Sequence, residues 1–112
     1  MTTDAESPPT EDDVRARALF VQRMAAAVGE EKRKEIAKEG KCLVLVAATY
    51  ADKAAANIVS SAEMVRLMTN LGKLRERDQS KIQLAMLDIR AANGIPCLVV
   101  AAGKAVIVHF PA

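Results

Sequence analysis

The sequence has few of the side chains from which most active sites and nucleic-acid surfaces are built. Of its 112 residues only 3% are aromatic, none is tryptophan, one is histidine and two are cysteine. The scarcity of aromatic rings removes the platforms on which RNA-binding and single-strand-binding sheets stack bases. Two cysteines do not make a disulfide framework. We expect Cys42 and Cys97 to be buried thiols; one disulfide is the alternative, if their strands lie side by side.

The motifs that hold phosphates, metals or nucleophiles are also missing. The glycines are isolated, so neither G-x-x-x-x-G-K-[ST] nor G-x-G-x-x-G occurs. His109, Cys42 and Cys97 lack the spacing of a metal site, and no third group orients a Cys–His pair. Asp88 is a carboxylate within an apolar helical pattern, and helical rotation can turn it outward. We therefore predict no catalytic, cofactor-binding or metal-binding residue, no cofactor and no enzymatic activity.

Long hydrophobic runs are absent too. None approaches the ~20 apolar residues of a membrane helix, and the acidic, polar N-terminus does not resemble a secretory signal. We therefore expect a cytoplasmic protein without a membrane partner. Residues 1–13 carry five acidic and no basic side chains, so the net charge of +2 leaves +7 for the rest. The length fits one domain. We predict a flexible acidic tail over residues 1–10 and a single domain over residues 11–112.

Three helices follow from periodicity and capping signals. Apolar residues recur at helical spacing between Val14 and Val28, after Thr10 as a plausible N-cap. Gly29 marks an end or a bend, and residues 30–39 read as a solvated helical extension. Residues 60–74 and 80–92 predict two more helices, whose capping boxes begin at Ser60 and Ser80. Asn93-Gly94 is predicted to stop the second of these helices. In the last helix, Leu84 and Leu87 are expected to widen the apolar stripe.

The strands are predicted from apolar runs and turn residues. Residues 41–50 and 95–111 are apolar on both alternating faces, and the second run turns at Ala102-Gly103-Lys104 into a hairpin. Residues 55–60 fit a weaker edge strand, with a helix over residues 52–56 as the alternative. We predict an α+β fold in the order α-β-β-α-α-β-β. A small, mostly antiparallel four-stranded sheet packs against three helices, and the terminal hairpin pairs with the strand at 42–50.

The segment G-I-P-C-L-V-V at 94–100, followed by G-K-A-V at 103–106, resembles the C-terminal segment of thioredoxin-fold proteins. That resemblance covers about 15 residues and implies a cis Ile95–Pro96 bond. The chain departs from the family because no C-x-x-C follows the strand at 42–50. The resemblance therefore implies a thioredoxin-fold-like domain without its redox motif.

The two apolar faces of the predicted strands indicate an oligomer, because both faces must be covered. One layer of helices covers only one face of a sheet, so either the helices divide between both faces or a second subunit covers one. Since the chain is short, we predict a homodimer and an unidentified protein partner. The candidate interaction surface consists of hairpin residues: Val99, Ala101, Ile107 and His109.

Together these observations predict a small non-enzymatic interaction or regulatory protein that acts by binding a macromolecule. A nucleic-acid-associated regulator is the alternative, because basic side chains gather near the junction of the last two helices. Glu76 and Asp78 interleave with this patch. The candidate basic patch consists of Arg66, Lys73, Arg75, Arg77 and Lys81.

Overall fold

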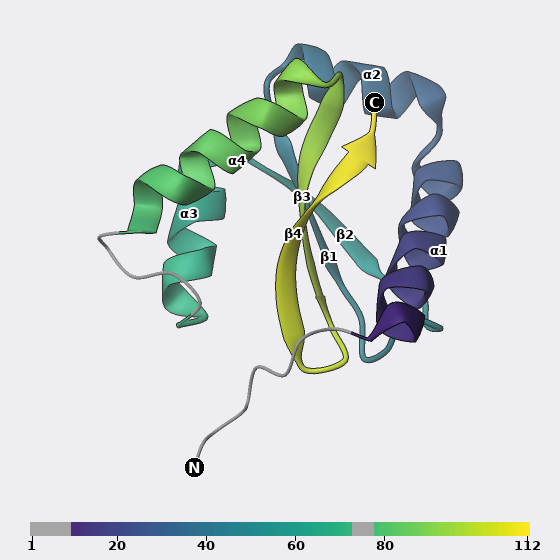
Figure 1. The fold of residues 1–112 in the computed structure, drawn as a ribbon. Helices are drawn as coiled ribbons and strands as arrows, with labels where there is room; N and C mark the ends of the chain where they lie inside the picture. The colour runs from purple at the N-terminus through teal and green to yellow at the C-terminus, as the bar shows by residue number, and fades with distance from the viewer. Residues whose placement is uncertain (1–9, 73–77) are drawn as a thin grey trace.

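The computed structural model describes residues 10–72 and 78–112. These residues form an α+β structure in the order α-α-β-β-α-α-β-β (Figure 1). None of their helices is long and apolar enough to cross a membrane. The helices are α1 (Glu11–Val28), α2 (Glu30–Lys38), α3 (Ser61–Asn70) and α4 (Gln79–Ala91). The strands are β1 (Cys42–Val46), β2 (Ala55–Val59), β3 (Gly94–Ala101) and β4 (Lys104–Pro111).

The first helical segment is two helices rather than one. Thr10 caps α1 as expected, with its hydroxyl accepting from the Asp13 N–H at 3.1 Å. Gly29 ends α1 at a φ of 90°, a value that L-residues with side chains rarely adopt. The chain then starts α2 in a new direction. The prediction of three helices was therefore wrong, because Gly29 breaks the segment that was taken as one helix with an extension.

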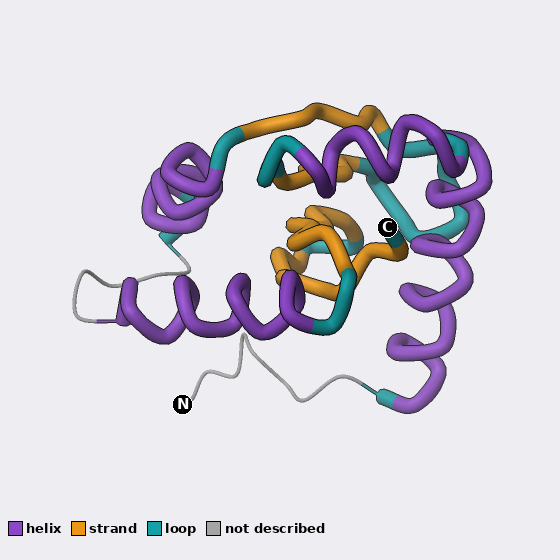
Figure 2. The backbone as a smooth tube through the Cα atoms, turned by 90° about the horizontal axis from the view of Figure 1, so that it is seen from above, coloured by secondary structure: helices purple, strands orange, loops and turns teal. Residues whose placement is uncertain are grey.

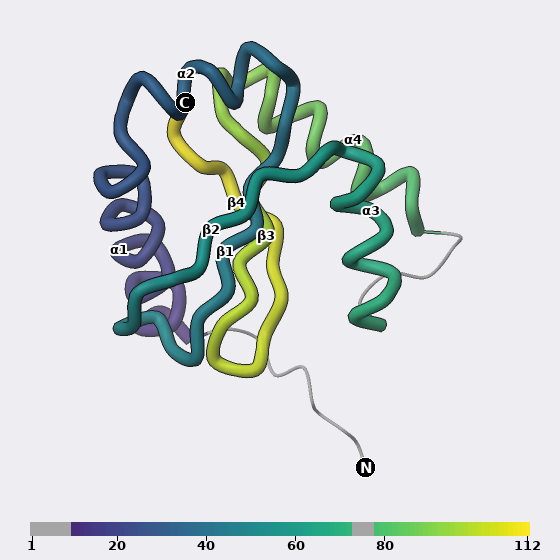
Figure 3. Tube along the Cα trace, turned by 180° about the vertical axis from the view of Figure 1, so that it is seen from behind, coloured from purple at the N-terminus to yellow at the C-terminus, as the bar shows by residue number. Residues whose placement is uncertain are grey.

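The sheet is mixed, with strand order β2-β1-β3-β4 (Figure 3). The outer pairs β1–β2 and β3–β4 are antiparallel, whereas the central pair β1–β3 is parallel and places Leu43 opposite Cys97. The prediction of a mostly antiparallel sheet thus missed the parallel centre, which arises because β2, α3 and α4 form the long crossover that parallel strands require. The pairing of the hairpin with the first strand and the edge position of β2 are confirmed.

Helices cover both faces of the sheet (Figures 1 and 2). On one face, α1 and α2 bury a first core that includes Phe20, Ile36, Leu45, Ile95 and Phe110. On the other, α3 and α4 bury a second core, consisting of Cys42, Val44, Met64, Met68, Met86 and Leu98. Alternation along each strand sends successive side chains to opposite cores. The apolar runs are explained by two helical layers from this chain, so a second subunit is not needed to cover the sheet.

Local signals were confirmed at some element ends and wrong at others. The Ser60 hydroxyl caps α3 by accepting from the Glu63 N–H at 3.1 Å. The helix α4 instead begins at Gln79, with Asp78 at the cap position and no side-chain bond there, so the cap predicted at Ser80 was wrong. The hairpin turn lies at Ala102 and Gly103, both with positive φ. No cis peptide bond occurs in the described residues, so the cis Ile95–Pro96 bond implied by the thioredoxin resemblance was wrong.

Candidate functional site

The hairpin residues predicted as an interaction surface do not share one exposed face. Val99 and Ala101 are buried in the first core. Ile107 is half-buried and packs against the second core, on the opposite side of the sheet. His109 is exposed, and its ring lies against Gly94, where an added Cβ atom would overlap it. Of these four residues, His109 alone is exposed.

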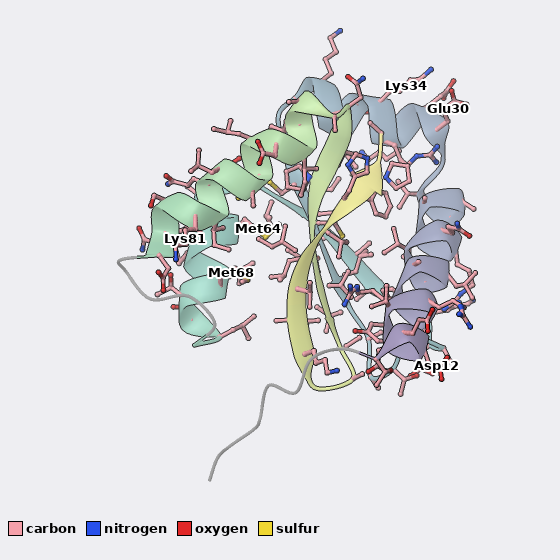
Figure 4. All side chains as sticks on the ribbon, in the orientation of Figure 1. Asp12, Glu30, Lys34, Met64, Met68 and Lys81 are labelled. Carbon is pink, nitrogen blue, oxygen red and sulfur yellow. The ribbon has the colours of Figure 1, made fainter. Side chains whose placement is uncertain are left out.

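The predicted basic patch is described only in part. Arg66 on α3 and Lys81 on α4 are exposed. Lys81 lies in the first turn of α4 (Figure 4) and forms an ion pair with Asp78, with 3.7 Å between Nζ and Oδ1. Lys73, Arg75 and Arg77 lie outside the described residues. The nucleic-acid surface stays a prediction, of which the structure describes Arg66 and Lys81.

The two cysteines lie on neighbouring strands but point to opposite faces of the sheet. Cys97 belongs to the first core and Cys42 to the second, and both are free and buried. Burial raises the pKa of the Cys97 thiol to about 12, with a smaller contribution from Cys42. Cys97 is therefore a neutral thiol at physiological pH, which does not suit a nucleophile. In the described part of the chain, no three His, Cys, Asp or Glu side chains gather as metal ligands.

Arg90, in the last turn of α4, joins three elements through its guanidinium group. Its Nη2 atom donates to the Gly40 carbonyl oxygen at 2.8 Å and to the Ser61 hydroxyl at 3.0 Å. Its Nη1 atom donates to the Lys41 carbonyl oxygen at 3.3 Å, and Nη2 also approaches the Cys42 sulfur at 3.3 Å. Arg90 thus holds the C-terminal end of α4 to the α2–β1 link and to the start of α3.

A groove of about 510 Å³ opens between α3 and α4. Arg90 lines it, and both of its Nη atoms donate to protein oxygens. Four of the other six lining residues are apolar. Met64 and Met68 of α3 belong to the second core (Figure 4). The lining residues are Ser61, Ala62, Val65, Gln83, Met86, Leu87 and Arg90.

Two leucines of α4 face solvent, and one of them, Leu87, also lines this groove. Leu84 is 59% exposed and Leu87 is 60% exposed, the two highest values among the large exposed hydrophobic residues described. Both were predicted to lie in the buried stripe of the helix, and that prediction was wrong. The signal was present, because Ile82, Met86 and Ile89 follow a spacing of four and three residues, and Leu84 and Leu87 fall on the other side of the helix.

The chain matches no protein-family model, no curated protein and no solved structure.

Proposed function

We propose that this protein is a non-enzymatic binding protein that recognises another macromolecule through the outer surface of α3 and α4. The observation that carries the proposal is the pair of exposed leucines, Leu84 and Leu87, three residues apart on α4, of which Leu87 also lines the groove. Scattered exposed leucines are ordinary, but adjacent ones beside an apolar groove are typical of interaction sites.

The chemistry of the groove favours binding over catalysis. Its one charged lining residue, Arg90, has both Nη atoms engaged with backbone carbonyls and the Ser61 hydroxyl. Apart from that hydroxyl and the Gln83 amide, a substrate would meet methyl, methylene and thioether groups rather than an acid or a base. Such a surface suits an apolar side chain from a partner, as in the packing of a helix into a groove.

Magnitudes indicate that the leucines alone cannot hold a partner. Burying the exposed parts of two leucines contributes on the order of 2–3 kcal/mol. Association costs at least about 4 kcal/mol in lost translational and rotational freedom. A partner must therefore add further contacts, either through apolar side chains of its own or by entering the α3–α4 groove. We call the two leucines and the groove together the α3–α4 surface.

Site-specific photo-cross-linking in the source cells tests the proposal. A photoreactive phenylalanine analogue at position 84 should give a discrete cross-linked product. The same analogue at position 19 should not, although Leu19 on α1 is 51% exposed and so is a matched control. With the analogue at position 87, Leu84→Asp should abolish the product because it places a charge in the apolar contact. Equal labelling from positions 84 and 19 would contradict the proposal.

A further inference from the structure

The exposed face of α4 carries an ordered stripe rather than two isolated leucines. Ser80, Leu84, Leu87 and Ala91 are all exposed and follow one another at spacings of four, three and four residues. At about 100° per residue, these four positions lie within about 60° of one another around the helix. They are opposite the half-buried Ile82 and Ile89. This spacing is that of a helix seam that packs against a second helix.

The stripe reads the same in both directions. From either end it runs small residue, leucine, leucine, small residue. If a second α4 helix lies antiparallel across it, each Leu84 faces a Leu87, and Ser80 faces Ala91. A surface that pairs with itself in this way satisfies the requirement of an isologous two-fold interface, in which the same patch serves both partners.

The charges beside the stripe also complement each other. Lys81 and Asp88 are exposed and lie on the same flank of α4, whereas Gln83 and Arg90 lie on the other flank. A two-fold axis perpendicular to the helices brings like flanks together. It therefore places Lys81 near Asp88 of the partner subunit, twice in each dimer. A parallel pairing would instead bring opposite flanks together, so that Lys81 would lie near Gln83 of the partner subunit and away from Asp88 of the partner subunit.

We propose that the occupant of the α3–α4 surface is a second copy of this chain, bound through an antiparallel pair of α4 helices. This proposal rests on the proposed function and names the partner. Leu84 and Leu87 form the centre of the contact, and Lys81 pairs with Asp88 of the partner subunit at each end. The ion pair between Lys81 and Asp78 does not oppose this, because Lys81 is 81% exposed and such pairs are weak.

The dimer should be weak and dependent on concentration. The helix α4 has 13 residues and is about 20 Å long. Two helices of that length bury less than the area of about 1,600 Å² that is usual for stable complexes. We expect dissociation in the micromolar range or weaker, with salt weakening it further because the pairing charges are exposed.

Charge exchange tests the arrangement. In sedimentation equilibrium on the purified full chain, Lys81→Glu and Asp88→Lys should each weaken self-association at least tenfold, since each creates two like-charge contacts. The double variant carrying both changes should restore association to within about threefold of the original. Both changes suit the helix dipole, with an acid near the N-terminus and a base near the C-terminus of α4, so a loss is not expected to reflect unfolding. Far-UV circular dichroism of each variant checks this.

Each outcome separates this inference from the proposed function. The antiparallel α4 dimer is overturned if the unsubstituted protein is monomeric at millimolar concentration. It is also overturned if the unsubstituted protein dimerises while the double variant stays monomeric. Purified protein with the photoreactive analogue at position 84 should give a product of twice the chain mass. If it does not, while the same analogue in cells cross-links a different protein, the dimer is wrong and the binding function stands. If position 84 labels nothing beyond position 19 in either setting, both proposals fail.

Discussion

At the level of single residues, burial decides what the cysteines can do. Cys97 lies in β3 within the first core and has no exposed surface. Its thiol pKa is raised to about 12 because ionisation would leave a charge without solvent. Cys42 is equally buried, facing the second core. Their positions on opposite faces explain why neighbouring strands do not bring two thiols into disulfide geometry.

The raised pKa predicts a loss of stability at alkaline pH. An unfolded thiol ionises near the ordinary value of 9.0, whereas the folded Cys97 thiol keeps its proton until about 12. Between these values the unfolded state binds fewer protons, so the free energy of unfolding falls by up to about 1.4 kcal/mol per pH unit. Urea unfolding at pH 7, 9 and 10.5 measures this slope. The Cys97→Ala variant should be less stable at pH 7, but its free energy of unfolding should fall less steeply above pH 9. An unchanged pH dependence would contradict the raised pKa of Cys97.

Gly94 and His109 show a second residue-level effect. Gly94 was expected to stop the helix that precedes it, and it does lie just after α4. The structure adds a reason that no single-sequence pattern reveals. The imidazole of His109, on the neighbouring strand β4, occupies the space that a Cβ atom at position 94 would need. Contacts between residues 15 positions apart depend on strand register, which local propensity does not fix.

At the level of elements, Arg90 connects parts of the chain that local signals could not link. The sequence predicted a helix ending at Asn93-Gly94 and a helix ending near Gly40. It did not indicate that Arg90, in the last turn of α4, would donate hydrogen bonds to the carbonyl oxygens that follow α2. The carbonyl groups of Gly40 and Lys41 lie just beyond the end of α2, where the helix offers no N–H donors. Arg90, from α4, supplies the donors instead.

Removing this connection should destabilise the protein. Arg90→Met deletes the donors to Gly40, Lys41 and Ser61, so we expect the free energy of unfolding to fall by about 1–3 kcal/mol. Arg66→Met is the matched control, since Arg66 is an exposed arginine on α3, and its effect should stay within about 0.5 kcal/mol. Chemical denaturation followed by far-UV circular dichroism measures both. Equal effects of the two substitutions would show that the Arg90 contacts add nothing to stability.

The positions of the helices and strands along the chain were largely predictable from the sequence. Which side of each helix would be buried was not. All four strands and the regions of the helices followed from apolar runs, glycines and caps, because these signals act within a few residues. The break at Gly29 was noted as an end or a bend, and only the backbone geometry decides between them. Leu84 and Leu87 were placed on the buried side, although Ile82 and Met86 define the opposite side. Which apolar stripe a sheet covers depends on tertiary packing, which periodicity alone does not determine.

At the level of the whole molecule, one sheet separates two cores. Alternate residues of β3 enter different cores, so that Ile95, Cys97 and Val99 face α1 while Leu98 faces α3 and α4. The apolar hairpin is therefore covered on both sides by helices of its own chain. With the sheet covered on both sides, the most exposed large hydrophobic residues described are Leu84 and Leu87 on the outer side of α4. A partner is therefore expected at that helix rather than at the sheet.

Because both cores share β1 and β3, we expect them to unfold together. Leu98→Ala removes fully buried methyl groups from the second core and should lower the free energy of unfolding by about 2–5 kcal/mol. Tyr50 reports on the other core. It packs edge-to-face on Phe20 at 5.9 Å, and it is the one tyrosine of a chain without tryptophan. Tyrosine fluorescence and far-UV circular dichroism should therefore give coincident urea transitions, shifted equally by Leu98→Ala.

The matched control is Leu19→Ala on the exposed side of α1, which should shift neither transition by more than about 0.5 kcal/mol. If Leu98→Ala moved the circular dichroism transition and left the Tyr50 transition in place, the two cores would be separate folding units. A rigid shared sheet argues against that outcome, because losing the α3 and α4 layer exposes Val44 and Leu98 on the strands that also bury Leu45 and Val99. Exposing those side chains would destabilise the same strands that form the first core. The two helical layers should therefore stabilise each other.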